Sequence, residues 1–287
     1  MGPIKNILFP VDFSESCFAM SAYVKRAAAL LGAKVSLIHV FDPSSYNGFE
    51  IYVRRVPEIA DEHQDIALRR LEGFLADDFP PPECRRMVVA GDAAAEIAAA
   101  AKEGFDMIIM PTHAGSFRRM LLGSTTAKVL NDADCPVLTS RHAETIAPHP
   151  LDHREWLCAI DLSADSERVL GFANQLATQA RGRLHILHAI QAPDRILPVK
   201  LDIQEQVQTG QERQAIERIA ELQKKIGSQA TVRVAHGAIK DALLEAAREY
   251  EADALLIGRS PQSGADGRLR DLTYTIVRDS PFPVMSV

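Results

Sequence analysis

The stretch "NILFPVDFSE", residues 6–15, returns later in the chain as "WLCAIDLSAD", residues 156–165. Each copy is an apolar run followed by an aspartate, Asp12 or Asp161, and by a serine two residues further on. A short apolar run bounded by polar turn residues is typical of a buried strand in a parallel sheet. The repeated stretch therefore predicts two copies of one α/β unit.

Three further matches follow in the same order at nearly constant offset. The two aspartates are 149 positions apart, and the second match, which keeps that offset, places His39 opposite His188. The matched segments are "AKVSLIHVF" with "GRLHILHAI", "MVVAGDAAAEIAAAAKEGFDMIIM" with "VRVAHGAIKDALLEAAREYEADALLIG", and "DADCPVLTS" with "RDSPFPVMSV". We interpret the pattern as a tandem duplication with domains at 1–142 and 154–287. Prolines and histidines interrupt both periodicities in the linker, 143–153.

Each half alternates short β-rich runs with longer helical patterns, which is typical of parallel βαβ units. In the first half the strands are expected at 6–11, 34–40, 86–90, 107–110 and 137–140. Ser14 or Ser16 would cap the first helix and Gly32 would end it, while a second helix would end at Gly104. The fold class is therefore α/β, with two tandem doubly wound domains, each a five-stranded parallel sheet covered by helices on both faces. Ligands bind such sheets beyond the carboxyl ends of the strands, where Asp12 and Pro111 fall.

Composition excludes several classes of function. The formal net charge of -6 over 287 residues leaves no basic footprint for DNA or RNA. The four cysteines are scattered without C-x-x-C spacing, so neither a zinc site nor a disulfide framework is predicted. No stretch reaches the roughly 20 apolar residues that a bilayer crossing needs, and the amino terminus has no secretory pattern. We expect a cytoplasmic protein that binds neither nucleic acid nor membrane.

Six motifs of the first half carry a resemblance to a known family. In chain order they are "ILFPVDFSE", "LIHVF", "AGDAAAEI", "MIIMPTHAG", "LLGSTTAKVL" and "DADCPVLT". This series resembles the universal stress protein family, and the likeness extends over both halves. It implies a Rossmann-like fold of the adenine nucleotide alpha hydrolase-like type, in a tandem form whose two domains pair as two subunits do elsewhere. The last strands, "PVLTS" and "PVMSV", would form that pairing, and a homodimer of the chain is an open alternative.

The family contains members that bind ATP and members that do not. The ATP-binding members carry G-x2-G-x9-G-[ST], whose glycines let backbone N–H groups approach phosphate oxygens. Here Pro111 and Ala114 replace the first two glycines, Gly115 would supply the lost flexibility, and Gly123-Ser124 is kept. The resemblance implies a nucleotide site formed by Pro10, Asp12, Val40, Met110, Pro111, His113, Ala114, Gly115, Gly123, Ser124, Thr125 and Thr126. Asp12 and Val40 would flank the adenine, Met110 and Pro111 the ribose, and the residues from Gly123 to Thr126, with Ala114, the phosphates.

Two alternatives stay open for these residues. The loop after Pro111 could be a plain connection in which Ser124 or Thr125 caps a helix, and Asp12 could itself be a cap or a solvated loop residue. The second half keeps Gly258, but Asp271-Leu272 stands where Gly-Ser should be. A carboxylate there would repel phosphates, so this half is not expected to bind ATP in the family manner. It would instead serve a structural or regulatory role, or close a cleft used by another ligand.

The function predicted from the sequence is that of a stress-response sensor or regulator. Its first domain would bind ATP or another adenine nucleotide, with Mg²⁺ as the companion ion. The alternative is a nucleotide-independent scaffold for protein partners. No catalytic residue and no metal site are predicted. Pro148 and Pro150 oppose the helix that would bring His149 and His153 together, and slow ATP hydrolysis is the most activity expected.

Overall fold

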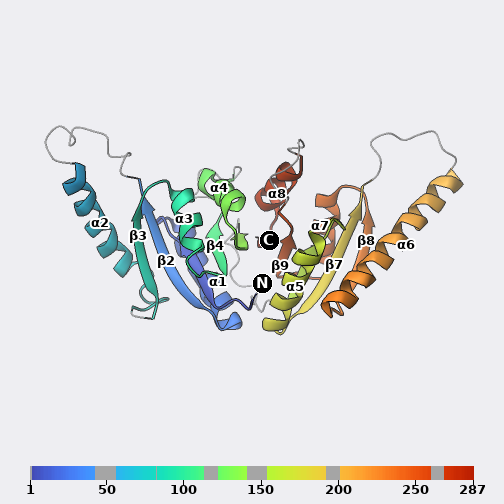
Figure 1. The fold of residues 1–287 in the computed structure, drawn as a ribbon, viewed down its shortest axis with the longest axis horizontal. Helices are drawn as coiled ribbons and strands as arrows, with labels where there is room; N and C mark the ends of the chain where they lie inside the picture. The colour runs from blue at the N-terminus through green and yellow to red at the C-terminus, as the bar shows by residue number, and fades with distance from the viewer. Residues whose placement is uncertain are drawn as a thin grey trace. The chain divides into compact units, whose positions relative to one another are not determined.

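The computed structural model describes residues 2–42, 56–81, 83–112, 122–140, 154–191, 201–259 and 268–287. These residues form two compact units, one drawn mostly from the first 151 residues and the other mostly from 152 onward. In each unit strands and helices alternate along the chain, and Figure 1 shows helices flanking the strands. The predicted fold class, two tandem α/β domains, is confirmed.

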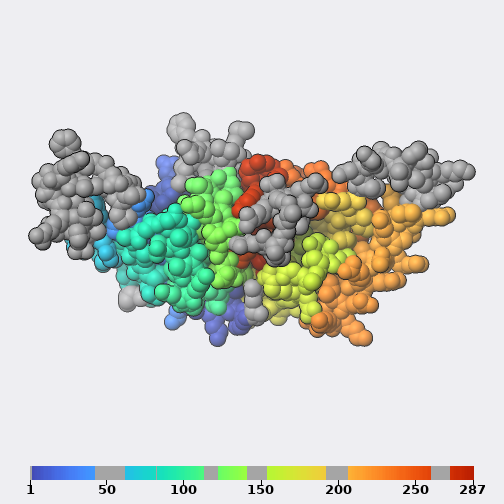
Figure 2. Space-filling view, turned by 45° about the horizontal axis from the view of Figure 1, so that its top comes forward, coloured from blue at the N-terminus to red at the C-terminus, as the bar shows by residue number. Residues whose placement is uncertain are grey.

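The first unit has a parallel sheet in the order β3-β2-β1-β4-β5. Its elements are β1 (Asn6–Pro10), α1 (Glu15–Leu31), β2 (Lys34–Phe41), α2 (Val56–Gly73), β3 (Arg85–Ala90), α3 (Ala93–Ala101), β4 (Met107–Pro111), α4 (Ser124–Asp132) and β5 (Val137–Ser140). Helices α3 and α4 pack against each other, where Figure 2 shows adjoining teal and green surfaces. An ion pair between Lys128 and Asp92, at 3.0 Å, joins them.

The second unit repeats this plan, with the strand order β10-β9-β6-β7-β8. Its elements are β6 (Glu155–Ala159), α5 (Ser166–Gln179), β7 (Arg183–Ile190), α6 (Leu201–Ile226), β8 (Thr231–His236), α7 (Ile239–Glu249), β9 (Ala254–Ile257), α8 (Arg268–Asp279) and β10 (Val284–Ser286). In both units the first strand lies between the second and the fourth, so the chain reverses its winding direction beside it.

Helix ends follow the predicted capping chemistry in one case and depart from it in another. The Ser14 side chain accepts a hydrogen bond from the Cys17 N–H at 3.3 Å, and Gly32 ends α1 at φ 62°. Glycine adopts this left-handed conformation without steric strain, because it has no Cβ. Helix α3 ends at Ala101 and not at Gly104, which instead adopts φ 97° in the following turn.

The core of each unit is centred on its first strand. Ile7, Leu8 and Phe9 in β1 are fully buried, as expected for a strand covered on both faces. Asp106, which directly precedes β4, holds the amino-terminal end of that strand beside β1. Its Oδ2 accepts hydrogen bonds from the N–H groups of Lys5 and Asn6 at 2.8 and 2.9 Å. Asp253 makes the same pair of bonds to Arg154 and Glu155 in the second unit. The duplication therefore extends to the side chains that align the strands.

Candidate functional site

In the first unit, the sheet edge formed by the carboxyl ends of β2, β1 and β4 collects most of the predicted site residues that the structure describes. Asp12 lies two residues after β1, Val40 is the second-last residue of β2, and Met110 and Pro111 end β4. Asp12 is exposed and Val40 half-buried, whereas Pro10, Met110 and Pro111 are buried. Parallel strands place their carboxyl ends at one edge, and the crevice lies where the winding direction reverses. His113, Ala114 and Gly115 lie outside the described residues.

The start of α4 is held against the end of β4. The Gly123 N–H donates to the Thr112 carbonyl oxygen at 2.9 Å, and the Thr126 hydroxyl donates to the Pro111 carbonyl oxygen at 3.1 Å. Gly123 is the N-cap of α4, and no side chain of the described residues caps this helix end. The alternative in which Ser124 or Thr125 caps the helix is therefore wrong. The first-turn N–H groups of a helix and its dipole attract anions, and Gly123 has no side chain to occupy them.

Asp12 is held by the residues that follow it. Its Oδ1 accepts hydrogen bonds from the Ser14 N–H at 2.9 Å and from the Cys17 thiol at 3.0 Å. Burial and the neighbouring Asp12 carboxylate raise the pKa of Cys17 to about 12, so the sulfur keeps its proton and acts as a donor. The carboxylate is thus oriented by a loop and a thiol, while Ser14 is the helix cap.

A ring cluster lies beside this aspartate. The Phe13 ring is centred 4.3 Å from the His39 ring and 5.2 Å from the Phe74 ring, and the Arg70 guanidinium lies 4.2 Å above it. Phe13 has φ 62°, an unusual value for a bulky residue. The Nδ1 of His39 lies 2.8 Å from the Val11 carbonyl oxygen, so Nδ1 carries the proton that forms this bond.

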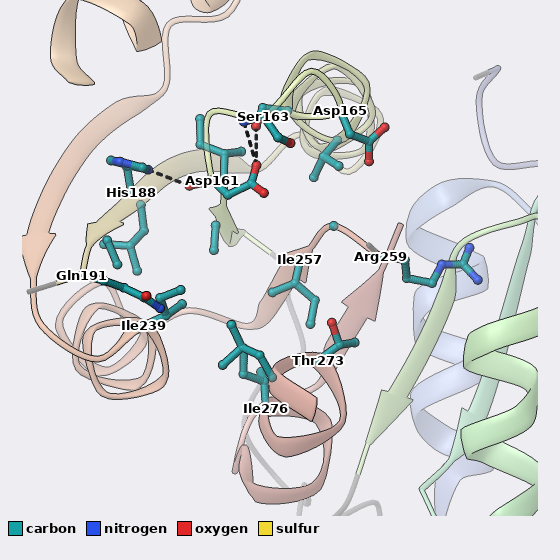
Figure 3. Close-up of a pocket in the computed structure, with 18 of the residues that line it drawn as sticks. Asp161, Ser163, Asp165, His188, Gln191, Ile239, Ile257, Arg259, Thr273 and Ile276 are labelled. Carbon is teal, nitrogen blue, oxygen red and sulfur yellow. Dashed lines mark hydrogen bonds between the residues drawn. The ribbon is translucent and has the colours of Figure 1, made fainter. Parts of the chain in front are cut away.

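The second unit contains a cleft of about 780 Å³ at the corresponding edge of its sheet, where β6, β7 and β9 end. Asp161, Ser163, His188, Ile257, Thr273 and Ile276 are among the residues that line it, and Figure 3 shows them around one cavity. Asp161 Oδ1 accepts hydrogen bonds from the Ser163 N–H and the Ser166 hydroxyl, both at 2.9 Å. Burial tends to raise the pKa of Asp161, but these hydrogen bonds outweigh it and hold the pKa below its ordinary value.

This arrangement repeats that of the first unit. Leu162 has φ 59° in the place of Phe13, and Ser166 donates to Asp161 as Cys17 does to Asp12. The His188 Nδ1 lies 2.9 Å from the Ile160 carbonyl oxygen, as His39 does from Val11. Both units therefore present an oriented carboxylate at the same point of the fold.

Comparison with known proteins identifies the family to which the chain belongs. A model of the universal stress protein family matches residues 3–141 and again residues 154–287. The chain is a universal stress protein. A universal stress protein of Mycolicibacterium smegmatis is 28% identical over 295 residues, which cover 98% of this chain and 96% of the relative. One of Thermus aquaticus is 32% identical over 142 residues, covering 48% of this chain and 98% of the relative.

Solved structures agree on the architecture of this universal stress protein. The crystal structure of a universal stress protein from Archaeoglobus fulgidus has a TM-score of 0.65 and 22% identity, covering 98% of this chain and 95% of its own. This likeness supports the two-unit fold. Among the described helices none combines the length and apolar character of a membrane span, and the described His, Cys, Asp and Glu residues form no cluster of three suited to a metal ion.

Sequence reasoning missed three parts of this universal stress protein. The Cys17 thiol donates to the predicted Asp12, and no motif indicates a donor there. The Phe13 ring cluster contacts the predicted His39, and its other members, Arg70 on α2 and Phe74 just after it, are distant in sequence. The third part is the cleft of the second unit, for which no lining residues were predicted. The signal for it was present, since the repeat itself aligns Asp161 with Asp12 and His188 with His39.

His39 makes the stability of this universal stress protein depend on pH. Burial lowers the pKa of His39 below its ordinary value of 6.5, and the Arg70 guanidinium acts in the same direction. The unfolded chain therefore binds the proton more readily, and this part of the stability, present above pH 6.5, is lost as the pH falls. We expect urea unfolding at pH 7.5 and 5.5 to show a smaller loss on acidification in His39→Gln than in the parent. An equal loss in both would contradict the assignment.

Proposed function

We propose that this protein is a stress-response sensor whose first unit binds ATP or another adenine nucleotide. One observation carries the proposal: the uncapped start of α4 is tied to the end of β4, at the sheet edge where Asp12 stands. A helix N-terminus without a side-chain cap offers N–H donors and positive potential to phosphate. The retained Gly123-Ser124 pair lies at that point.

The parts of the nucleotide would meet different chemistry along this edge. The N–H groups from Ser124 to Thr126 and the hydroxyls of Ser124 and Thr125 would receive the phosphates, and Mg²⁺ would accompany them. Asp12 has two donors on one oxygen, and a carboxylate offers about four acceptor positions, so it can accept further N–H or O–H groups of the ligand. Val40 and Met110 would supply apolar contact to the adenosine part.

A scaffold without nucleotide is the second candidate function. It is favoured by Pro111, which ends β4 without an N–H to offer at the position where ATP-binding members have glycine. On this alternative the start of α4 is only a connection, and the working surface is one that recognises protein partners. A measurement of nucleotide binding separates the two functions. The boundaries at 1–142 and 154–287, the cytoplasmic location and the pairing of the two domains stay predictions.

The test begins with protein purified without added nucleotide. We expect denaturation to release an adenine nucleotide near one per chain, or calorimetry to show ATP binding at one site, with Mg²⁺ tested separately. Ser124→Ala and Asp12→Ala should each weaken that binding by about tenfold or more, because each removes a hydrogen-bonding group to the ligand. The matched control is Asp161→Ala, which makes the same change in the second unit. If the folded chain neither releases an adenine nucleotide nor binds ATP, the sensor function is contradicted and the scaffold function is favoured.

A further inference from the structure

The cleft of the second unit has the size and lining of a small-molecule site. Its volume of about 780 Å³ lies within the range of pockets that enclose drug-sized ligands. Its walls are largely apolar, with Ile160, Val169 and Leu187 from one part of the chain and Ile239, Ile257 and Ile276 from another. Figure 3 shows labelled isoleucines around the cavity. A flat, apolar body would replace water in contact with these side chains.

Asp161 is the polar group that gives this apolar cleft its chemistry. The hydrogen bonds from the Ser163 N–H and the Ser166 hydroxyl share Oδ1, and a carboxylate offers about four acceptor positions, so Asp161 can accept further donors from a ligand. Asp165, which also lines the cleft, is already paired with Arg168 through two bonds of 2.6 and 2.7 Å. A carboxylate with spare lone pairs in an apolar cavity is best matched by a pair of N–H donors.

The features that would hold a phosphate in the first unit are changed here. Leu272, which stands in the place of Ser124, lines the cleft with a side chain that has no hydrogen-bonding group. Helix α8 begins at Arg268, a full turn before Leu272, so its first-turn N–H groups do not lie at that position. Arg259 lines the cleft as well, but Figure 3 shows its side chain turned away from Asp161.

We propose that this cleft binds a phosphate-free aminoheterocycle or amidine, with its flat apolar body between the isoleucine walls and its N–H donors on Asp161. The site is separate from the nucleotide site proposed for the first unit, and it stands whether or not that unit binds ATP. The two units would then have kept one scaffold while their ligands diverged in charge.

The test uses the full chain and 2-aminobenzimidazole, with 2-methylbenzimidazole as the probe of equal shape that lacks the amino group. Calorimetry is expected to show one site per chain for the amino compound and binding about tenfold weaker for the methyl compound. Asp161→Asn should weaken binding of the amino compound by a similar factor, since the amide keeps an oxygen for Ser163 and Ser166 but loses the charge. Asp12→Asn, the identical change in the first unit, should leave the affinity unaltered.

Further variants separate this site from others. Thr273→Trp, at a half-exposed position on the cleft, should block the amino compound by filling the cavity while the core stays intact. Saturating ATP should not displace the probe. The proposal is overturned if the folded chain fails to bind the amino compound, if both probes bind equally, if Asp12→Asn weakens binding as much as Asp161→Asn does, or if ATP displaces the probe.

Discussion

The double substitution Gly123→Asp and Ser124→Leu is expected to weaken ATP binding by about a hundredfold without destabilising the protein. It gives the first unit the residues that stand at the corresponding positions of the second, Asp271 and Leu272. The new carboxylate would lie at the uncapped start of α4, where it repels phosphate and competes for the same N–H groups. Calorimetric titration with ATP measures the effect.

The same substitution separates binding from folding. Gly123 has φ −60° and ψ 141°, which an aspartate adopts without strain, and aspartate is a good N-cap. We therefore expect the free energy of unfolding to stay within about 1 kcal/mol of the parent value. Asn131→Asp, near the other end of α4, adds the same charge away from the site and should leave ATP affinity unaltered. An unchanged affinity in the double variant would argue against phosphate binding at this helix end.

Replacing Arg86 by methionine is expected to cost about 3 kcal/mol of stability. The half-buried Arg86 guanidinium donates hydrogen bonds to four backbone carbonyl oxygens that follow or end α2. The acceptors, with their distances, are Leu71 at 2.9 Å, Phe74 at 3.3 Å, Phe79 at 2.7 Å and Cys84 at 3.2 Å. Methionine fills a similar volume but leaves these carbonyl groups without their donor, and that desolvation dominates the loss.

Urea denaturation at constant pH measures this loss, with Arg85→Met as the neighbouring control. Arg85 is exposed on the same strand, so its substitution should change stability by no more than about 0.5 kcal/mol. Arg86→Lys should recover only part of the stability, because one ammonium cannot replace the planar guanidinium toward four acceptors. If Arg86→Met were as stable as the control, the bonds to the segment after α2 would not contribute to folding.

Much of the fold was predictable because its signals are local. The alternation of apolar runs with helical patterns, and the repeat of that alternation, depend on residues close in sequence. Ser14 and Gly32 were readable as the ends of α1, since caps act within one turn. The end of α3 could not be predicted in this way. The helix stops at Ala101, and Gly104 takes its positive φ in the turn that follows and not at the helix end.

The sequence by itself determined that the chain consists of two α/β units of one family and that Asp12, Val40 and Met110 share a sheet edge. These conclusions need only strand order and the rule that parallel strands end together. The tertiary structure alone decided which groups orient them: the Cys17 thiol on Asp12, the Arg70 and Phe74 side chains around Phe13, and Gly123 as the cap of α4. It also placed an apolar cleft beside Asp161 in the half whose phosphate motif is lost. The ring cluster and the cleft arise from contacts between segments distant in the chain. The Cys17 and Gly123 contacts are local, but they depend on how the loops before α1 and α4 bend, which no residue pattern encodes.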